Sequence, residues 1–304
     1  MYRVTKENLI YAMSPENDPV LRVPSGSTVV FETCDCFEDQ IRSADTQFDA
    51  LDWNRINPAT GPVYVEGAEP GDILAVRIEK IHIANQGVMV TGPNLGVMGF
   101  DLTENHIRIV PVRNGNVVFA DNLEIPVNPM IGVIGTAPAV ESISCGTPGG
   151  HGGNMDCKQI REGVTLLLPV HVPGALLGLG DLHAAMADGE VAVCGVEIAG
   201  EVTVTVEVMK GRELPLPMVI TDEHVITIAS EVELDKASDQ AVINMVNFLH
   251  EQWQVPKEEA TFLLSIAGDV RICQVVDPLK TARVELPIAY AEAIGVDIES
   301  YLIK

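Results

Sequence analysis

The first two thirds of this 304-residue chain is divided into short, β-branched segments separated by glycine and proline. Residues 201–208 alternate valine with threonine or glutamate, which is typical of a strand with one buried face. Residues 27–34 and 73–82 have a similar composition, and Pro70–Gly71 predicts a type II turn before the second of them. Asp188–Gly189 predicts a further tight turn. Many short strands joined in this way favour a β-sandwich or a barrel.

The last third of the chain has a different pattern. Residues 235–253 place apolar side chains at helical spacing, with Asp235 or Ser238 as the expected N-cap. A second helix is expected to start after Pro256 and to end at Gly268. We expect residues 269–276 to form a buried strand after it.

These patterns predict two parts that share one core. The first, residues 1–210, is a β-rich body that carries the functional site. The second, residues 211–304, is an α+β part packed on that body. A hydrophobic content of 47% is ample for a large common core.

Composition also limits what the chain can bind and where it works. No apolar run is long enough to span a bilayer, and the first residues lack a signal-peptide core, so we expect a cytoplasmic protein with no membrane partner. The net charge is −24, with 43 acidic against 19 basic residues, which argues against nucleic acid and favours a neutral or cationic substrate. The six cysteines form no CxxC pair and are expected to be reduced thiols.

Two glycine-rich stretches near the middle of the chain, residues 146–158 and 178–190, gather side chains that can bind a metal. These side chains are His151, Asp156, Asp181 and His183. Glycine lets a chain or a ligand approach closely, and imidazole with carboxylate suits a divalent cation. The stretches therefore predict a site.

Glu197 is a further candidate, because it stands in an almost wholly apolar run, residues 191–198. A carboxylate buried there has to be paired, hydrogen-bonded or bound to a metal. In an extended segment Asp181 and His183 would project from the same face. The structural alternatives are a hydrogen-bonded core histidine and a Glu197 that faces solvent on an edge strand.

Other residues offer catalytic chemistry. Asp35 lies in an acidic cluster just after a strand, and Glu66 lies where a strand passes into a turn, although both positions also suit solvated or structural carboxylates. Cys157 precedes Lys158, whose charge would lower the thiol pKa and so allow a thiol nucleophile. The sequence has no G-x-S-x-G motif of a serine hydrolase.

Several motifs, in collinear order over nearly the whole chain, resemble the acetamidase/formamidase family. They lie at residues 61–72, 152–156, 173–177 with 180–183, and 188–190, and the tail agrees at 260–265 and 269–277. The resemblance implies a metal-dependent hydrolase of short aliphatic amides. It also implies a mainly β fold, a jelly-roll-like β-sandwich with additional small β elements and C-terminal α+β elements, assembled as a homodimer or a higher oligomer.

The resemblance assigns Asp156 and His183 as metal ligands and matches Asp35 to an acidic position of the family. This chain departs from the family at residues 37–39, Phe-Glu-Asp, where family members commonly have small residues. The departure bears on the shape of the pocket.

For the reaction itself we expect zinc on Asp156, His183 and a third carboxylate, either Glu197 or Asp35, with calcium as the alternative metal if the ligands are mostly oxygen. A second carboxylate, Asp35 or Glu66, would carry the proton. The candidates for holding the oxyanion are Asn154 and the N–H groups of Gly152 and Gly153, with His151 and Asp181 in support.

A small apolar-walled pocket would select formamide or acetamide by excluding longer chains. Two alternatives stay open. The first is a thiol-dependent amidase that uses Cys157. The second is a non-catalytic β-sandwich that binds a small ligand or serves in an assembly.

Overall fold

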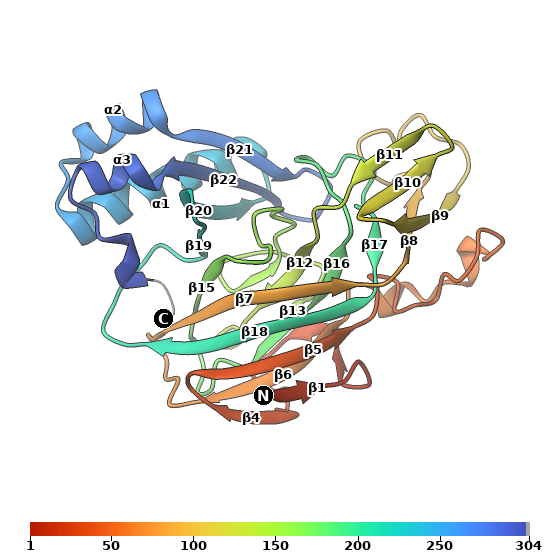
Figure 1. Cartoon of the computed structure of the whole chain (residues 1–304), viewed down its shortest axis with the longest axis horizontal. Coiled ribbons are helices and arrows are strands. Elements are labelled where there is room, and N and C mark those ends of the chain that lie inside the picture. Colours follow the sequence, from red (N-terminus) through yellow and green to blue (C-terminus); the bar gives the residue numbers. More distant parts are fainter. Residues whose placement is uncertain (302–304) are drawn as a thin grey trace.

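The computed structural model describes residues 1–301, which form a mainly β fold built on two large sheets (Figure 1). The first sheet has nine strands. In spatial order they are β1 (Tyr2–Val4), β5 (Ser27–Thr33), β18 (Gly200–Met209), β7 (Ile73–Ile83), β15 (Thr165–Pro169), β19 (Met218–Ile220), β20 (His224–Glu231), β22 (Lys280–Pro287) and β21 (Asp269–Gln274).

The second sheet has eleven strands. Eight follow one path: β11 (Leu123–Pro126), β10 (Asn116–Ala120), β9 (His106–Arg113), β8 (Gln86–Thr91), β17 (Glu197–Ile198), β16 (Leu177–His183), β12 (Met130–Gly135) and β14 (Gly152–Asn154). The strand β6 (Ala59–Glu66) pairs with β16, and on β6 lie β2 (Leu9–Ile10) and β4 (Leu21–Pro24). A separate small sheet joins β3 (Ala12–Met13) to β13 (Ile143–Ser144).

The main core lies between the two large sheets. Val204 of β18 and Phe31 of β5 belong to the same buried cluster as Ile134 of β12 and Leu179 of β16. The alternation predicted for residues 201–208 is confirmed, because Val202, Val204 and Val206 are buried while the residues between them are partly exposed. The sandwich and the mainly β fold class are therefore confirmed.

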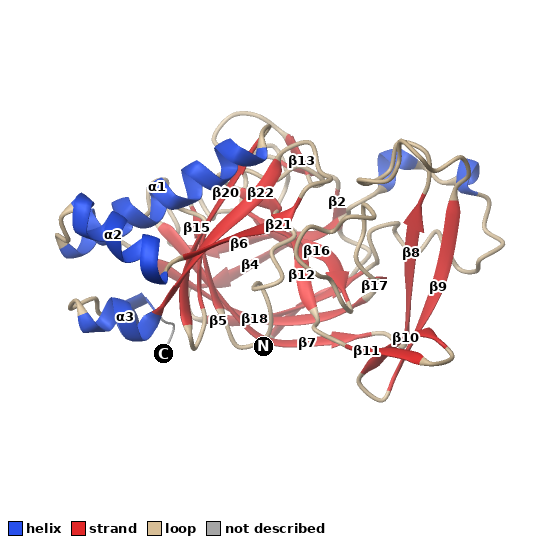
Figure 2. Cartoon of the chain, turned by 90° about the horizontal axis from the view of Figure 1, so that it is seen from above, coloured by secondary structure: helices blue, strands red, loops and turns tan. Residues whose placement is uncertain are grey.

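The C-terminal elements continue the first sheet and add helices to it. The strands β19 to β22 extend the sheet beyond β15, and α1 (Leu234–Trp253), α2 (Lys257–Ala267) and α3 (Ile288–Ala293) gather at that end of the molecule (Figure 2). The helix α1 packs on β20 and β22 through a second apolar core. The expected helix–helix–strand succession is confirmed. The boundary near residue 210 stays a prediction.

Two local expectations for this region are wrong. The N-cap of α1 is Glu233, not Asp235 or Ser238, and the hydroxyl of Ser238 instead donates to the carbonyl oxygen of Leu234. The strand β21 is largely exposed rather than buried, because it lies at the edge of the sheet.

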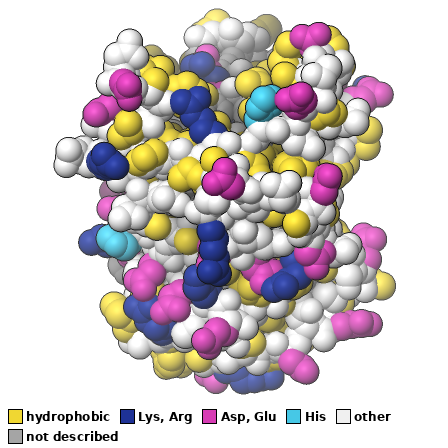
Figure 3. Space-filling model, turned by 90° about the vertical axis from the view of Figure 1, so that its right-hand side faces the viewer, with side chains coloured by type: hydrophobic (Ala, Val, Ile, Leu, Met, Phe, Trp, Pro, Cys, Tyr) yellow, Lys and Arg dark blue, Asp and Glu magenta, His cyan; other side chains and the backbone are white. Residues whose placement is uncertain are grey.

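The strands β8 to β11 form an arm at the end of the molecule opposite the helices (Figure 1). On the face at this end, lysine and arginine side chains are interspersed with acidic and hydrophobic ones (Figure 3). Short 3-10 turns at Phe48–Ala50, Trp53–Arg55 and Ile298–Tyr301 complete the described secondary structure. Within residues 1–301 no helix has the length and apolar character to span a bilayer.

Candidate metal centre

The last residues of β16 bring two candidate ligands to the junction of three strands. Asp181 and His183 both lie on β16, where His183 is paired with Glu197 of β17 on one side and with Met130 of β12 on the other. The strand is not regular there, since Asp181 has a φ of 55°. Both side chains nevertheless point into the same buried space, as the sequence predicts for two residues of one face.

Four carboxylates surround the imidazole of His183, which is 1% exposed. From its Nε2 atom the distances are 3.2 Å to Glu197, 3.6 Å to Asp156, 3.6 Å to Asp181 and 3.8 Å to Glu190. Asp156 follows β14, and Glu190 follows the tight turn that the sequence predicts at Asp188–Gly189. We call these five residues the His183 cluster.

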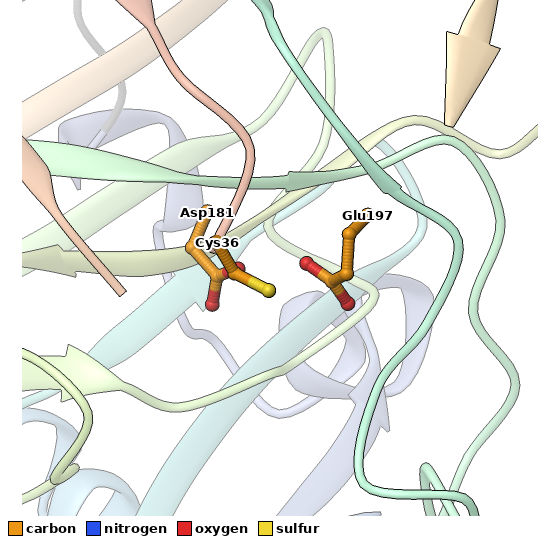
Figure 4. Close-up of side chains that lie close together, drawn as sticks. All are labelled: Cys36, Asp181 and Glu197. Atoms are coloured by element: carbon orange, nitrogen blue, oxygen red, sulfur yellow. The ribbon is translucent and has the colours of Figure 1, made fainter. Parts of the chain in front are cut away.

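The side chains at this place form two adjacent groups that could each hold a cation. The first group is Asp156, His183 and Glu190, and the second is Cys36, Asp181 and Glu197; within each group the ligand atoms lie within 4.8 Å of one another. Figure 4 shows the second group, in which the Cys36 thiol lies beside the two carboxylates. The groups adjoin, because His183 contacts both carboxylates of the second group.

Two glycines provide the room for these side chains. A Cβ atom at Gly132 would lie 2.5 Å from Oδ1 of Asp156 and 2.7 Å from Oδ2 of Asp181. A Cβ atom at Gly195 would lie 2.7 Å from Nδ1 of His183. Any other residue at either position would displace a ligand.

The His183 cluster has more acidic groups than basic ones, four carboxyl groups against one imidazole. Burial raises the pKa of Glu197 to about 7, and burial followed by the neighbouring Asp277 raises the pKa of Asp156 well above its ordinary value. Burial opposes protonation of His183, but the surrounding carboxylates, Glu197 first, raise its pKa well above the ordinary value.

Several buried polar atoms of the cluster also lack hydrogen-bond partners. Atoms with no hydrogen bond are Oδ1 of Asp156, Oδ1 of Asp181, Nδ1 of His183 and Oε2 of Glu197. An unpaired buried carboxylate is very costly, so these donor atoms fit a divalent cation.

A carboxylate and an amide lie beside the two groups. Nδ2 of Asn154 donates to Oδ2 of Asp277 at 2.9 Å, and both residues line the same cavity as His183. Asp277 belongs to neither cation group. The cavity has a volume of about 330 Å³, and among the described residues that line it there is no lysine or arginine.

Some residues expected at the site have other positions. Glu66 is exposed at the end of β6, whereas Ala59, at the opposite end of that strand, pairs with Gly180 next to the cluster. The structure thus does not bring Glu66 to the cavity. Asp35 does not line the cavity either, and its Oδ1 accepts hydrogen bonds from the backbone N–H groups of Phe37 and Asp39. It shapes the loop that carries Cys36.

The residues of the glycine-rich stretch just before Asp156 also lie largely outside the cavity. The N–H of Gly152 donates to the carbonyl oxygen of Gly149, and neither Gly152 nor Gly153 lines the cavity. His151 lies in a neighbouring cavity with His171, and burial lowers its pKa to about 4. Cys157 is fully buried in the main core, so its thiol has no path to a substrate.

Three residues of the site are missed by the sequence reasoning: Cys36, Glu190 and Asp277. Glu190 and Asp277 lie within motifs noted above, and Cys36 follows Asp35 in the acidic cluster. All three are in loops or turns, where no periodicity tells which way a side chain points. Only the pairing of distant segments places them beside His183.

The sequence profile of the Acetamidase/Formamidase family matches residues 5–145 and 141–291 of the chain. The crystal structure of an acetamidase from Bacillus halodurans is 52% identical in sequence, with a TM-score of 0.95 over 97% of this chain and 100% of that one. An acetamidase from Yersinia enterocolitica is 30% identical, with a TM-score of 0.91 over 97% of this chain and 93% of that one.

The formamidase of Methylophilus methylotrophus is more distant. It is 24% identical over an alignment of 255 positions that covers 64% of this chain and 63% of that protein. The chain therefore spans less than two thirds of the length of this relative.

Proposed function

The chain belongs to the acetamidase/formamidase family, and we propose that it is a metal-dependent amidohydrolase that releases ammonia from small neutral amides such as formamide and acetamide. One observation carries this proposal. The His183 cluster places four carboxylates around one imidazole, buried and with unpartnered donor atoms, beside a cavity that a small ligand can enter.

We propose zinc as the metal, with calcium as the alternative. The first group offers one nitrogen and two carboxylates, and the second adds the sulfur of Cys36 to Asp181 and Glu197. Nitrogen and thiolate donors suit zinc, whereas calcium takes oxygen ligands. The ligand set of the sequence prediction, Asp156 with His183, thus extends to Glu190, and Glu197 falls in the second group.

A divalent cation held by these groups would supply Lewis acidity, which makes water a stronger nucleophile and polarises a carbonyl group. The chain's own residues supply the remaining steps. The Asn154 side chain has a second N–H besides the one given to Asp277, and it can donate to the amide oxygen as negative charge develops there.

We propose that Asp277 moves the proton. It lies in the cavity outside both cation groups, so it can accept a proton from the attacking water and pass it to the nitrogen. A carbon–oxygen bond forms, the carbon–nitrogen bond breaks, and ammonia leaves with that proton. Asp277 takes the place given to Asp35 or Glu66 in the sequence prediction.

Removing the metal tests the proposal. The purified protein is dialysed against a chelator, its metal content is measured by elemental analysis, and ammonia release from formamide and acetamide is assayed before and after zinc or calcium is restored. We expect activity to disappear with the metal and to return with one of the two ions. Full activity in verified metal-free protein would overturn the metal-dependent mechanism.

The same assay decides between the alternatives. Inactivation by iodoacetamide that Cys157→Ser prevents would support a thiol amidase, although the burial of Cys157 speaks against it. Metal-loaded protein that releases no ammonia from any amide would favour a non-catalytic binding or assembly protein. A cytoplasmic location and a homodimer or higher oligomer stay proposals.

A further inference from the structure

The cavity beside His183 is larger than formamide or acetamide requires. Its volume is about 330 Å³, and one water molecule takes about 30 Å³ in the liquid, so there is room for roughly ten waters. Acetamide carries only a methyl group beyond its carboxamide. Cavities upward of roughly 300 Å³ are the size that holds larger organic ligands. A cation beside His183 would take part of this volume, and the remainder is still larger than a methyl group needs. The expectation of a pocket that excludes longer chains stays a prediction, and the cavity favours the opposite.

The extra space has a chemical character of its own. The cavity is lined by the carboxylates, His183 and Asn154 and also by hydrophobic side chains, several of which belong to one apolar cluster. We call six of these hydrophobic side chains the apolar wall: Phe37, Trp53, Ile56, Val90, Leu95 and Val193. With no lysine or arginine among the described lining residues, nothing there would pair with an anionic tail.

The residues of the apolar wall are held in place by packing against one another and against their neighbours. Phe37 of the loop after β5 and Val90 of β8 are buried in one apolar cluster, and Ile56 and Val193 pack against it. The cluster thus joins the segment that carries Trp53 to the arm. Trp53 is held by Phe48, with ring centroids 5.0 Å apart.

Trp53 is the most exposed member of the wall, since Ile56, Leu95 and Val193 are partly buried. Its exposed fraction is 40%, whereas Phe37 and Val90 are exposed by 4% and 3%. An apolar group that covers the indole would remove this area from water, and an aromatic group could stack on it.

We propose that the substrates of this protein are primary amides with an apolar tail of several carbons, and that Trp53 determines this specificity. The inference rests on the proposed function, because the carboxamide is bound at the His183 cluster while the tail lies on the apolar wall. One methylene in a hydrophobic pocket changes kcat/KM by about 10- to 200-fold. A tail on this half-open wall should therefore raise kcat/KM at least about tenfold over acetamide.

The test is the kcat/KM for ammonia release by the metal-loaded protein with formamide, acetamide, hexanamide and phenylacetamide. We expect hexanamide and phenylacetamide to exceed acetamide by about tenfold or more. Trp53→Ala should lower kcat/KM for phenylacetamide about tenfold more than for acetamide. Phe100→Ala is the matched control, since Phe100 is an 83% exposed aromatic residue that does not line the cavity.

The outcomes separate the inference from the proposed function. Ammonia release from acetamide with equal or falling kcat/KM toward the longer amides would overturn the inference and leave amide hydrolysis standing. A preference for longer amides that Trp53→Ala leaves intact would remove Trp53 from the specificity. No ammonia from any amide, with the metal content verified, would overturn the proposed function, and the inference with it.

Discussion

Two ionic clusters in this molecule, one partly and one fully buried, differ in how their charges are compensated. Around Arg283, which is 1% exposed, the guanidinium donates to both oxygens of Asp188 at 2.8 and 3.0 Å and to Glu285 at 2.7 Å. Lys158 lies 3.1 Å from Asp188, so two cations meet two carboxylates. We call these four residues the Arg283 cluster. In the His183 cluster, four carboxylates meet one imidazole.

The hydrogen bonds differ in the same way. The carboxylates of the Arg283 cluster have partners, and the guanidinium lowers the pKa of Asp188 although burial acts to raise it. The His183 cluster keeps unpartnered atoms on Asp156, Asp181 and Glu197, and burial raises the pKa of Glu197 to about 7. A balanced cluster is complete without a ligand, whereas the His183 cluster needs added positive charge. We therefore take the first as structural and the second as functional.

The largest expected effect comes from removing the centre of the His183 cluster. His183→Ala deletes one cation ligand of the first group, and loss of a residue that merely supports a ligand already costs about 10- to 100-fold. Ammonia release should therefore fall by more than about 100-fold while circular dichroism stays unchanged. His106→Ala, on the arm, is the control and should retain activity. Turnover close to that of the natural protein would remove His183 from the site.

Breaking the balanced cluster should affect stability most. Arg283→Met removes the nearest cation of the buried Glu285 and leaves Asp188, whose side chain is 28% exposed, with Lys158 alone. Removal of one partner of a buried pair costs about 3–5 kcal/mol. Chemical denaturation measures the loss. Arg77→Met is the control, because Arg77 of β7 forms an ion pair with Glu79 at 3.4 Å near solvent, where both side chains are about a third exposed. Equal losses in the two variants would contradict a structural role for the Arg283 cluster.

In the His183 cluster without metal, removal of a charged side chain should increase stability instead of lowering it. The pKa of Glu197 is raised from 4.5 to about 7, so its contribution to stability is complete below pH 4.5 and is lost as the pH rises through 7. Glu197→Gln removes this loss and can still accept from the N–H of Gly195, which donates to Oε1 at 2.8 Å.

Metal-free Glu197→Gln should therefore be more stable than the metal-free natural protein by about 1–3 kcal/mol at pH 8, with no difference at pH 4. Thermal unfolding at both pH values, after chelation, measures this. Destabilisation at pH 8 would mean that the cluster is balanced without a cation. With zinc bound the variant should lose stability instead, since a ligand is missing.

The sequence predicted much of the sandwich because its strands are locally encoded. Valines at alternate positions of residues 201–208 are enough to place one face of β18 in the core. Pro70–Gly71 likewise encodes its turn, where Gly71 has a φ of 94° and the N–H of Asp72 donates to the carbonyl oxygen of Glu69. The exposure of β21 was not predictable, because its place at the sheet edge depends on pairings of distant segments.

The candidate site was predictable only in part for a similar reason. Asp156, Asp181, His183 and Glu197 were found because glycine or an apolar run marks each of them. Glu66 carried only a local signal, and it lies on a strand whose other end faces the site. Asp277 and Cys36 reach the cavity from segments hundreds of positions apart, so no local pattern joins them.

The smallest expected effect tests how much Lys158, compared with Arg283, contributes to the stability of the Arg283 cluster. Lys158 reaches Asp188 from the rim, where its side chain is 31% exposed, whereas Arg283 binds both oxygens of Asp188 from the buried side. Ion pairs near solvent contribute about 0–1 kcal/mol, because water screens the charges and the lysine side chain loses freedom. Lys158→Met should therefore cost less than about 1 kcal/mol, a small part of the loss in Arg283→Met, when both are measured by chemical denaturation. A loss as large as that of Arg283→Met would show that the rim cation is needed for balance. The contrast with the His183 cluster would then depend on total charge rather than on the buried hydrogen bonds of one guanidinium.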